Sequence, residues 1–533
     1  MREHRQQTQG MMQQRIKFHF DGRIVAVDDQ PITRTVLEWL RASAHRTGTK
    51  EGCAEGDCGA CTVIVAERAG PDAPSSAMRT SGIRAGGLIL RPINACIRFL
   101  PTLHGKALLT VEDLSRMTSA PLHPVQQAMV DCHASQCGFC TPGFVMSLFA
   151  LYVNHMTAGT RPDRAALADG LAGNLCRCTG YRPILDAGER MFTLPPALLD
   201  TAPIEASLDR IAAETPEIFT YAASGTPTVA TGPSRIDHFT APRTVAALAT
   251  LYARTPGSRL LAGATDIGLW VNKQFRDVGD LLYLGDVADL RMIEHDGDTL
   301  RIGAGVPLED AWGALIALIP DVREMAVRFA GPPVRHAGTM GGNIANGSPI
   351  GDTAPVLMAL DARLILQHDE ETRSLPLSTF YHDYMRNDLA PGEFLRAIEI
   401  PLPAPGTLIR AYKVSKRFDC DISALSCGLA VVLEGGTVRH IRIAFGGMAA
   451  TVRRARKTEA ILQDAPWSEE SVRAAMAALE QEFAPLSDLR ASSAYRMRAA
   501  RNLLWRFWLE TRPERSRPPS ATRVRQFTLA GAA

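Results

Sequence analysis

The 533-residue sequence lacks several patterns that mark common classes of protein. No run approaches the roughly 18–20 apolar residues that span a bilayer, and the longest candidate, residues 144–153, is far too short. The polar opening, residues 1–14, has no apolar core of the kind a signal peptide needs, so we expect a disordered leader. The net charge is only +2, and no basic stripe with interleaved aromatic residues indicates nucleic acid. We therefore expect a cytoplasmic protein without membrane or nucleic-acid partners.

Cysteine is unevenly distributed along the chain. Nine of the eleven cysteines precede residue 180, whereas Cys420 and Cys427 stand alone near the end and read as ordinary core or surface residues. Disulfides are rare in a reducing compartment, so clustered cysteines there indicate metal or redox chemistry.

The chain is long enough for three or four domains. Its opening predicts two short strands joined at Asp21–Gly22, then a helix over 36–46 capped by Thr33 or Thr35. A strand follows over 62–65. Residues 69–87 are rich in Gly, Pro, Ser and Ala, which indicates a surface insertion, and 88–100 returns to strand-like sequence.

From His123 the sequence changes to helical spacing, and four helices with cysteine loops between them are predicted up to about residue 193. Pro124, Pro142 and Pro183 lie where such helices could begin. Residues 196–235 read as a linker, and an α/β pattern starts at Ile236.

The first cysteine group has the spacing C-x4-C-x2-C, followed by one more cysteine. This is the spacing of a plant-type 2Fe–2S ferredoxin. Gly52, Gly56 and Gly59 would let the loop curl closely around a cluster and aim N–H groups at its sulfurs. The alternatives are structural cysteines or a zinc site, although zinc sites more often use two C-x2-C pairs. The predicted ligands are Cys53, Cys58, Cys61 and Cys96.

The second group combines a C-x2-C pair, Cys137 and Cys140, with a C-x-C pair, Cys176 and Cys178. Each pair lies at the edge of a predicted helix, where free N–H groups favour an anionic cluster. Cys132 complicates this group, because with Cys137 and Cys140 it repeats the C-x4-C-x2-C spacing. A helix over 125–134 would point Cys132 away from the loop, so we expect it not to be a ligand.

Two glycine-bearing segments, 260–268 and 337–355, follow in the α/β region. Neither is the G-x-G-x-x-G fingerprint of a Rossmann site. Both could cradle a pyrophosphate with backbone amides, with close approach at Gly341, Gly342 and Gly347. Asn343, Ser348 and Asp352 could bond to ribityl or ribose hydroxyls. Taken alone, such loops are more often plain turns.

The motifs QCGFCTPG and CRCTGYRPI, behind a plant-type loop, resemble the iron–sulfur module of the xanthine dehydrogenase family of molybdenum hydroxylases. The resemblance covers roughly residues 15–190. It assigns Cys137, Cys140, Cys176 and Cys178 to the second cluster and leaves Cys132 out. It also implies that the helical cluster lies nearer the molybdenum and the plant-type cluster nearer the flavin.

The glycine segments resemble the flavin signatures of the same family's middle domain, which has the vanillyl-alcohol-oxidase (PCMH) fold. Tyr384 matches a tyrosine near the nicotinamide side. The stretch 416–423 matches a mobile loop beside the flavin, but its acidic pattern differs, which leaves NAD or oxygen open as acceptor. His336 reads as structural. The flavin contacts that the resemblance implies are Leu260, Leu261, Ala262, Gly263, Ala264, Thr265, Asp266, Ile267, Phe329, Thr339, Gly341, Gly342, Asn343, Asp352, Leu395 and Lys413.

The fold class that this implies is multidomain α+β. The expected order is a leader (1–14), a plant-type 2Fe–2S β-grasp domain (15–105), a helical 2Fe–2S domain (106–195), the linker (196–235), an FAD-binding PCMH-type domain (236–404) and a C-terminal domain like that of the CO dehydrogenase flavoprotein (405–533).

The function that the resemblance implies is electron transfer within a xanthine dehydrogenase. Hypoxanthine or xanthine would be oxidised to urate at a molybdenum cofactor on a separate large subunit, so no catalytic residue is expected in this chain. Electrons would pass through two 2Fe–2S clusters and FAD to NAD, within a heterotetramer of two small and two large chains. Alternatives are another molybdenum hydroxylase, acting on an aldehyde, CO or an aromatic compound, a stand-alone NADH-linked reductase, or a zinc-binding interaction module.

Overall fold

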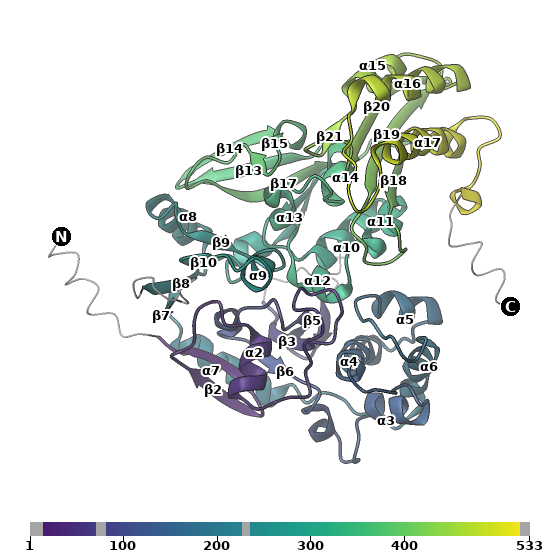
Figure 1. The fold of residues 1–533 in the computed structure, drawn as a ribbon. Coiled ribbons are helices and arrows are strands. Elements are labelled where there is room, and N and C mark those ends of the chain that lie inside the picture. Colours follow the sequence, from purple (N-terminus) through teal and green to yellow (C-terminus); the bar gives the residue numbers. More distant parts are fainter. Residues whose placement is uncertain (1–13, 71–81, 226–234, 523–533) are drawn as a thin grey trace. The chain divides into compact units, whose positions relative to one another are not determined.

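A computed structural model describes residues 14–70, 82–225 and 235–522. The predicted leader up to residue 13, part of the predicted insertion and part of the predicted linker lie outside these ranges. The described chain divides into two compact units. The first comprises 1–291, 307–310 and 331–339, and the second comprises 292–306, 311–330 and 340–533. Figure 1 labels most of the elements of both. Within the described ranges, no helix is both long and apolar enough to cross a membrane.

The first unit begins with a six-stranded sheet in the order β2-β1-β6-β3-β5-β4. The pair β1 and β6 is parallel and the other neighbours are antiparallel. Both faces of β3 are buried: Val63 and Val65 enter one core, and Ile64 and Ala66 enter another. This sheet is the predicted plant-type domain. Its strands are β1 (Ile16–Phe20), β2 (Arg23–Val27), β3 (Thr62–Arg68), β4 (Ile83–Ala85), β5 (Leu88–Asn94) and β6 (Ala107–Leu109).

Local sequence explains how this sheet starts. Asp21 and Gly22 both have positive φ, +55° and +75°, as a two-residue hairpin turn requires. Thr35 caps α2 (Val36–Glu38) through a reciprocal capping box with Glu38. The helix is shorter than predicted, because a π-helical turn (Trp39–Ser43) continues it. The predicted insertion is also not all loop, since β4 forms an edge strand on β5.

The second cysteine group lies in a block of four helices, as the spacing predicted (Figure 1). Proline occupies the first turn of α3, α4 and α6, where its missing N–H costs nothing. Helix α3 ends at Asp131, earlier than predicted, so Cys132 is its C-cap rather than a residue on its face. The helices are α3 (Pro124–Asp131), α4 (Thr141–Ala158), α5 (Arg164–Gly170) and α6 (Arg182–Arg190).

The stretch predicted as a linker, 196–235, is largely structured. It holds α7 (Ala202–Glu214), whose Ile204 and Leu208 join the core of the helical block. It also holds β7 (Ile218–Ser224), which pairs with the next strand along its whole length. Both elements have regularly spaced apolar residues. The stretch was nevertheless predicted to be a linker, because its end is rich in Gly and Pro. A four-stranded sheet follows in the order β7-β8-β10-β9, built from β8 (Ile236–Pro242), β9 (Arg259–Leu261) and β10 (Leu281–Tyr283), with helices α8 (Val245–Arg254) and α9 (Ile267–Asn272).

The second unit contains an antiparallel sheet in the order β11-β12-β17-β13-β14. Its strands are β11 (Ile293–Asp296), β12 (Thr299–Gly303), β13 (Arg363–His368), β14 (Glu371–Pro376) and β17 (Phe394–Pro401), and a small hairpin follows β14 with β15 (Tyr381–Asp383) and β16 (Arg386–Asn387). The intervening helices are α10 (Leu308–Leu318), α11 (Arg323–Arg328), α12 (Pro332–Ala337), α13 (Met340–Asn346) and α14 (Thr353–Ala359), of which α12 and the start of α10 (308–310) belong to the first unit.

A second antiparallel sheet, β18-β19-β20-β21, ends the second unit. Apolar residues of α15, α16 and α17 fill its core. Helix α14 lies close to β19, because a Cβ on Gly428 would come within 2.3 Å of the Pro355 carbonyl oxygen. The elements are β18 (Leu408–Val414), β19 (Leu425–Glu434), β20 (Thr437–Gly446), β21 (Arg453–Arg454), α15 (Arg456–Leu462), α16 (Glu469–Glu482) and α17 (Ser493–Thr511).

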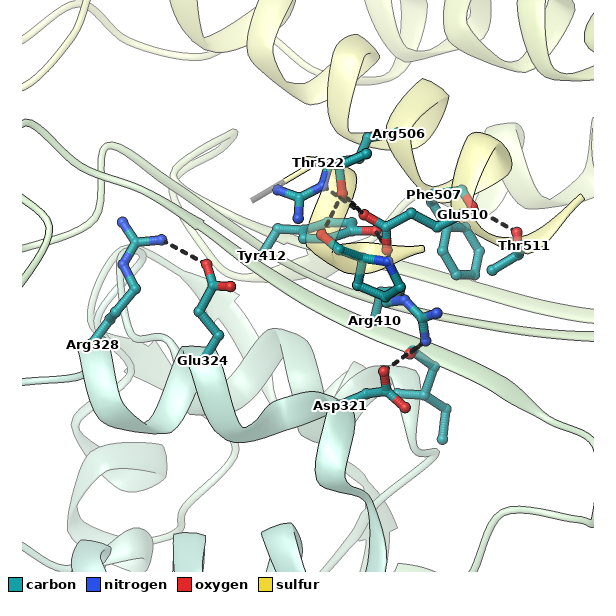
Figure 2. Close-up of polar contacts among 12 residues, drawn as sticks. Asp321, Glu324, Arg328, Arg410, Tyr412, Arg506, Phe507, Glu510, Thr511 and Thr522 are labelled. Carbon is teal, nitrogen blue, oxygen red and sulfur yellow. Dashed lines mark hydrogen bonds and ion pairs between the residues drawn. The ribbon is translucent and has the colours of Figure 1, made fainter. Parts of the chain in front are cut away.

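A buried carboxylate fastens α17 to β18, as Figure 2 shows. The side chain of Glu510 is fully buried and accepts hydrogen bonds from Arg410, Arg506 and Tyr412. Arg410 also bonds to Asp321. Burial alone would favour the neutral acid, but the surrounding donors outweigh it and lower the pKa of Glu510.

Candidate cofactor sites

The first four predicted ligands come together at the edge of the β3–β5 pair. Cys61 and Cys96 are buried, with their sulfurs 3.3 Å apart. Hydrogen bonds with Cys58 and Cys96 lower the pKa of the Cys53 thiol, and the same contact with Cys53 raises the pKa of Cys58. Four thiols that share protons in this way occupy one small volume.

The backbone of the first loop is shaped around these sulfurs. The N–H groups of Cys58 and Glu55 point at the Cys53 sulfur from 3.4 and 3.5 Å. Gly56 and Gly59 have φ of +80° and +68°, a conformation that side chains disfavour. A Cβ on Gly52 would come within 2.8 Å of the Cys58 sulfur. The loop therefore leaves room for a group that lies against its backbone.

The second four predicted ligands come together beside the N-terminus of α4. Cys140 is the N-cap residue of α4. Burial, followed by a hydrogen bond with Cys176, raises the pKa of the Cys140 thiol to about 12. A hydrogen bond with Cys137 raises the pKa of Cys178. Cys137 and Cys178 are exposed, so this group lies nearer the surface of its unit than the first.

Thr179 and Tyr181, which follow the C-x-C pair, both form hydrogen bonds with its first cysteine, Cys176. The hydroxyl of Thr179 lies 3.2 Å, and its N–H 3.5 Å, from the Cys176 sulfur. The N–H of Cys176 donates to the hydroxyl of Tyr181 at 3.1 Å. Tyr181 itself has a positive φ of +69°, which marks a tightly turned loop. Neither Thr179 nor Tyr181 was singled out from the sequence, although both belong to the CRCTGYRP motif.

Cys132 has a different environment from the eight predicted ligands. Burial, followed by the charges of Asp186 and Asp131, raises the pKa of its thiol. The four predicted ligands of the second group contact one another instead.

In the described ranges, no three His, Cys, Asp or Glu side chains are arranged around a single metal ion. A binuclear cluster places only two thiolates on each iron, so paired sulfurs are the arrangement that it needs.

Each cysteine group therefore fits a 2Fe–2S cluster by the chemistry of its donors. Four thiols gather in each, and N–H or O–H groups point at Cys53 in one and Cys176 in the other. Cluster sulfurs carry negative charge and are commonly stabilised by such donors.

The predicted flavin contacts fall in both units. In the first unit, the loop after β9 turns sharply at Ala264, whose φ is +63°. A Cβ on Gly263 would lie 1.9 Å from the Ala337 carbonyl oxygen, so this loop and the segment before Thr339 touch through their backbones. Burial raises the pKa of Asp266.

In the second unit, three predicted contacts meet at one buried point. The Lys413 ammonium lies 2.6 Å from Asp352 and 6.0 Å from the centre of the Phe329 ring. Ser423 donates to the other oxygen of Asp352 at 2.6 Å.

The other predicted contacts of the second unit lie on β17 and α13. Leu395 is buried on β17. A Cβ on Gly341 would lie 2.4 Å from Ala304, and Asn343 on the same helix accepts a hydrogen bond from Thr353.

The loop 416–423 is held by an arginine that the sequence analysis missed. Arg328 donates to the carbonyl oxygens of Lys413 and Phe418 at 2.8 and 3.1 Å, and its guanidinium lies 4.4 Å from the centre of the Phe418 ring. Tyr384, in contrast, lies in the β15–β16 turn and is 64% exposed. The only sequence signal for Arg328 is its position directly before Phe329.

His336 lies in the first unit, in the last turn of α12, and is buried. Burial lowers the pKa of its imidazole to about 4, although the Glu309 carboxylate opposes this shift. The imidazole is therefore neutral near pH 7. That His336 has a structural role stays a prediction.

Four family models match the chain. They are described as a 2Fe–2S iron–sulfur cluster binding domain (residues 18–99), a [2Fe–2S] binding domain (110–189), an FAD binding domain in molybdopterin dehydrogenase (234–403) and a CO dehydrogenase flavoprotein C-terminal domain (410–511). The chain belongs to the molybdenum hydroxylase family. It carries the iron–sulfur and FAD-binding part of such an enzyme, and the predicted fold class is confirmed.

Known relatives of this molybdenum hydroxylase chain differ in their substrates. This chain is 31% identical in sequence to "Xanthine dehydrogenase" of Emericella nidulans, over 88% of this chain and 36% of that protein. It is 29% identical to "Aldehyde oxidase 1" of Rattus norvegicus, over 85% and 36%. A solved carbon monoxide dehydrogenase chain from Hydrogenophaga pseudoflava is 30% identical, with TM-score 0.48, over 50% of this chain and 94% of that one. The chain spans about a third of the length of these curated relatives.

Proposed function

We propose that this chain is the electron-transfer subunit of a xanthine dehydrogenase. In this proposal Cys53, Cys58, Cys61 and Cys96 hold one 2Fe–2S cluster, and Cys137, Cys140, Cys176 and Cys178 hold the other. The observation that carries it is the gathering of eight cysteines into two separate groups of four, in a chain that also has an FAD-binding domain.

The cofactors themselves supply the redox chemistry: FAD exchanges electron pairs with NAD, and each 2Fe–2S cluster carries one electron at a time. The residues of the chain set where those groups lie and how they are surrounded. The buried Cys61 and Cys96 would keep the first cluster away from water. Thr179 directs a hydrogen bond to Cys176, and the buried Asp352–Lys413 pair with Phe329 would form a wall of the flavin site.

Substrate oxidation is assigned to a molybdenum cofactor on a larger partner subunit, in a cytoplasmic heterotetramer of two small and two large chains. The second cysteine group suits a place near that partner, because Cys137 and Cys178 are exposed and Phe139 between the C-x2-C cysteines is 47% exposed. Large apolar side chains left exposed often mark interaction sites. NAD is proposed as the final acceptor, and Tyr384 as a residue near its nicotinamide.

Purification of the chain together with the proteins that bind it tests this proposal. We expect two distinguishable 2Fe–2S signals in the EPR spectrum of the reduced protein, one releasable FAD per chain and a co-purifying molybdenum protein. The complex should reduce NAD with xanthine. Iron and labile sulfide each well below four per chain would contradict the cluster assignment, because two 2Fe–2S clusters need about four of each.

A second candidate is the corresponding subunit of an aldehyde-oxidising molybdenum hydroxylase. It is supported by the aldehyde oxidase relative, whose identity of 29% is close to the 31% of the xanthine dehydrogenase. Reduction of the same complex by an aromatic aldehyde, but not by xanthine, would favour this second function over the first.

A further inference from the structure

The loops of the two cysteine groups touch directly within the first unit. The N–H of Leu175 donates to the carbonyl oxygen of Cys58 at 3.0 Å. Cys58 belongs to the first group of proposed ligands, and Leu175 is bonded to Cys176 of the second. A single hydrogen bond therefore completes a backbone connection from the sulfurs of one group to those of the other.

Glycine allows this close approach. A Cβ on Gly59 would lie 2.2 Å from the carbonyl oxygen of Gly173, and a Cβ on Gly143 would lie 2.1 Å from the carbonyl oxygen of Gly59. Such distances exclude a side chain at either position. The two loops are in contact through bare backbone, and no side chain separates them.

Asn174 ties the contact together. It is only 3% exposed, and its Nδ2 donates to the Gly59 carbonyl oxygen at 3.1 Å and to the Thr62 hydroxyl at 3.3 Å. Its Oδ1 accepts from Ser147 on α4 at 2.6 Å. One amide thus joins the first cysteine loop, the second cysteine loop and the helix that begins after Cys140.

The Gly59 carbonyl does not need this bond. The Gly59 carbonyl already accepts from the N–H of Thr62 at 3.1 Å and from its hydroxyl at 2.7 Å. A buried carbonyl needs only one partner. The added bond from Asn174 is therefore a crosslink, and its effect is to fix the position of one loop against the other.

We propose that Asn174 is a positioning residue for electron exchange between the two clusters. It holds the Leu175 N–H on the Cys58 carbonyl and so keeps the two sets of ligands at a fixed distance and orientation. The exchange moves one electron from one cluster, which is oxidised, to the other, which is reduced, and no bond forms or breaks. This inference rests on the proposed cluster ligands and adds a residue that binds neither cluster.

The test compares variants of the full-length, cluster-loaded protein. Asn174→Ala removes the whole crosslink, and Asn174→Asp keeps an acceptor for Ser147 but has no donor for Gly59. We expect both to keep the iron and sulfide content of the wild type. The magnetic splitting between the two reduced clusters in EPR should shrink. Intercluster electron exchange should slow about tenfold, which is the lower end of the loss in activity seen when an outer-shell partner of a metal site is removed.

Asn154→Ala is the matched control, because Asn154 is an exposed asparagine on α4, the helix that carries Ser147. It should leave both readouts unchanged. Wild-type splitting and exchange rate in both Asn174 variants would overturn the inference. If the Asn174 variants lose iron, Ser147→Ala decides, because it removes only the donor to the Asn174 oxygen, and an unchanged splitting there would equally overturn it. A wild-type protein without two cluster signals would instead refute the proposed function.

Discussion

The ammonium of Lys413 lies 2.6 Å from a carboxylate oxygen of Asp352, and their side chains are only 2% and 3% exposed. The two residues come from β18 and from the turn before α14, more than sixty positions apart in sequence. Removing one partner of such a pair leaves an uncompensated buried charge, whereas removing both does not.

Lys413→Met should therefore reduce the free energy of unfolding by about 3–5 kcal/mol, because Asp352 keeps its charge but loses its counterion. The double variant Asp352→Asn/Lys413→Met should recover a large part of this loss, since the amide oxygen introduced at position 352 can still accept from Ser423. Urea titration of the two single variants and the double variant measures the coupling between the residues.

Flavin content separates stability from binding in the same variants. If the pair forms part of the flavin wall, the double variant should fold and yet retain less FAD after gel filtration than the wild type. Full retention of FAD by a stable double variant would assign the pair a structural role alone, and a Lys413→Met protein as stable as the wild type would contradict the ion pair itself.

Cysteine substitutions test which sulfurs hold the second cluster. Cys132 is the C-cap of α3, and its neighbours include Asp131 and Asp186. Cys132→Ser should therefore retain the wild-type iron and sulfide content. Cys178→Ser should lose about half of both, because each 2Fe–2S cluster needs four thiolates. Chemical assay and EPR of the reduced proteins measure this, and loss of the second signal in Cys132→Ser would reverse the assignment.

The hydroxyl of Thr179 should raise the reduction potential of the second cluster. It lies 3.2 Å from the Cys176 sulfur, and a thiolate ligand can only accept, so the hydroxyl is the donor. Reduction adds negative charge, which this donor stabilises. Thr179→Val should lower the potential by roughly 40 mV, if the bond contributes about 1 kcal/mol more to the reduced state.

Thr179→Ser keeps the hydroxyl and serves as the control for that measurement. Redox titration followed by EPR should place Thr179→Ser near the wild type and Thr179→Val below it. An equal potential in all three proteins would show that the hydroxyl does not act on the cluster.

The sequence was sufficient for the parts of this molecule that follow from local patterns. Short spacings and fixed turn residues explain the hairpin at Asp21–Gly22 and the four-helix block. Two misses have one cause, which is that glycine- and proline-rich sequence beside a short strand concealed the strand. The strand β4 is defined by its bonds to β5, and β7 by its bonds to β8 across a glycine- and proline-rich stretch.

Among functional residues, Asn174 and Arg328 were out of reach because the groups that they contact lie far away in sequence. Asn174 matters through Gly59, and Arg328 through Phe418. An isolated asparagine or arginine carries no spacing signal, so only the folded chain reveals which backbone groups it bonds. The cysteines differ because each group contains closely spaced cysteines, C-x4-C-x2-C in the first and C-x2-C with C-x-C in the second, and these spacings are visible in the sequence.

Glu510 should make the stability of the C-terminal sheet depend on pH. Its side chain is fully buried against Arg410 and Arg506, and the surrounding donors hold its pKa below the ordinary 4.5. A lowered folded-state pKa means that the stabilisation is complete above the unfolded value and is lost as the pH falls below that value and through the folded pKa. Glu510→Gln should cost about 2 kcal/mol or more at neutral pH, since Arg506 loses its counterion and Arg410 keeps only Asp321.

Hydrogen exchange of α17 peptides, corrected for the pH dependence of intrinsic exchange, measures both effects. Between about pH 5 and about pH 3, protection of α17 in the wild type should fall more steeply than in Glu510→Gln, which cannot titrate. Glu480→Gln is the matched control, because Glu480 pairs with Arg501 of the same helix at the exposed surface and such pairs contribute little. Parallel pH profiles in the wild type and Glu510→Gln would mean that the carboxylate of Glu510 is not what joins α17 to β18.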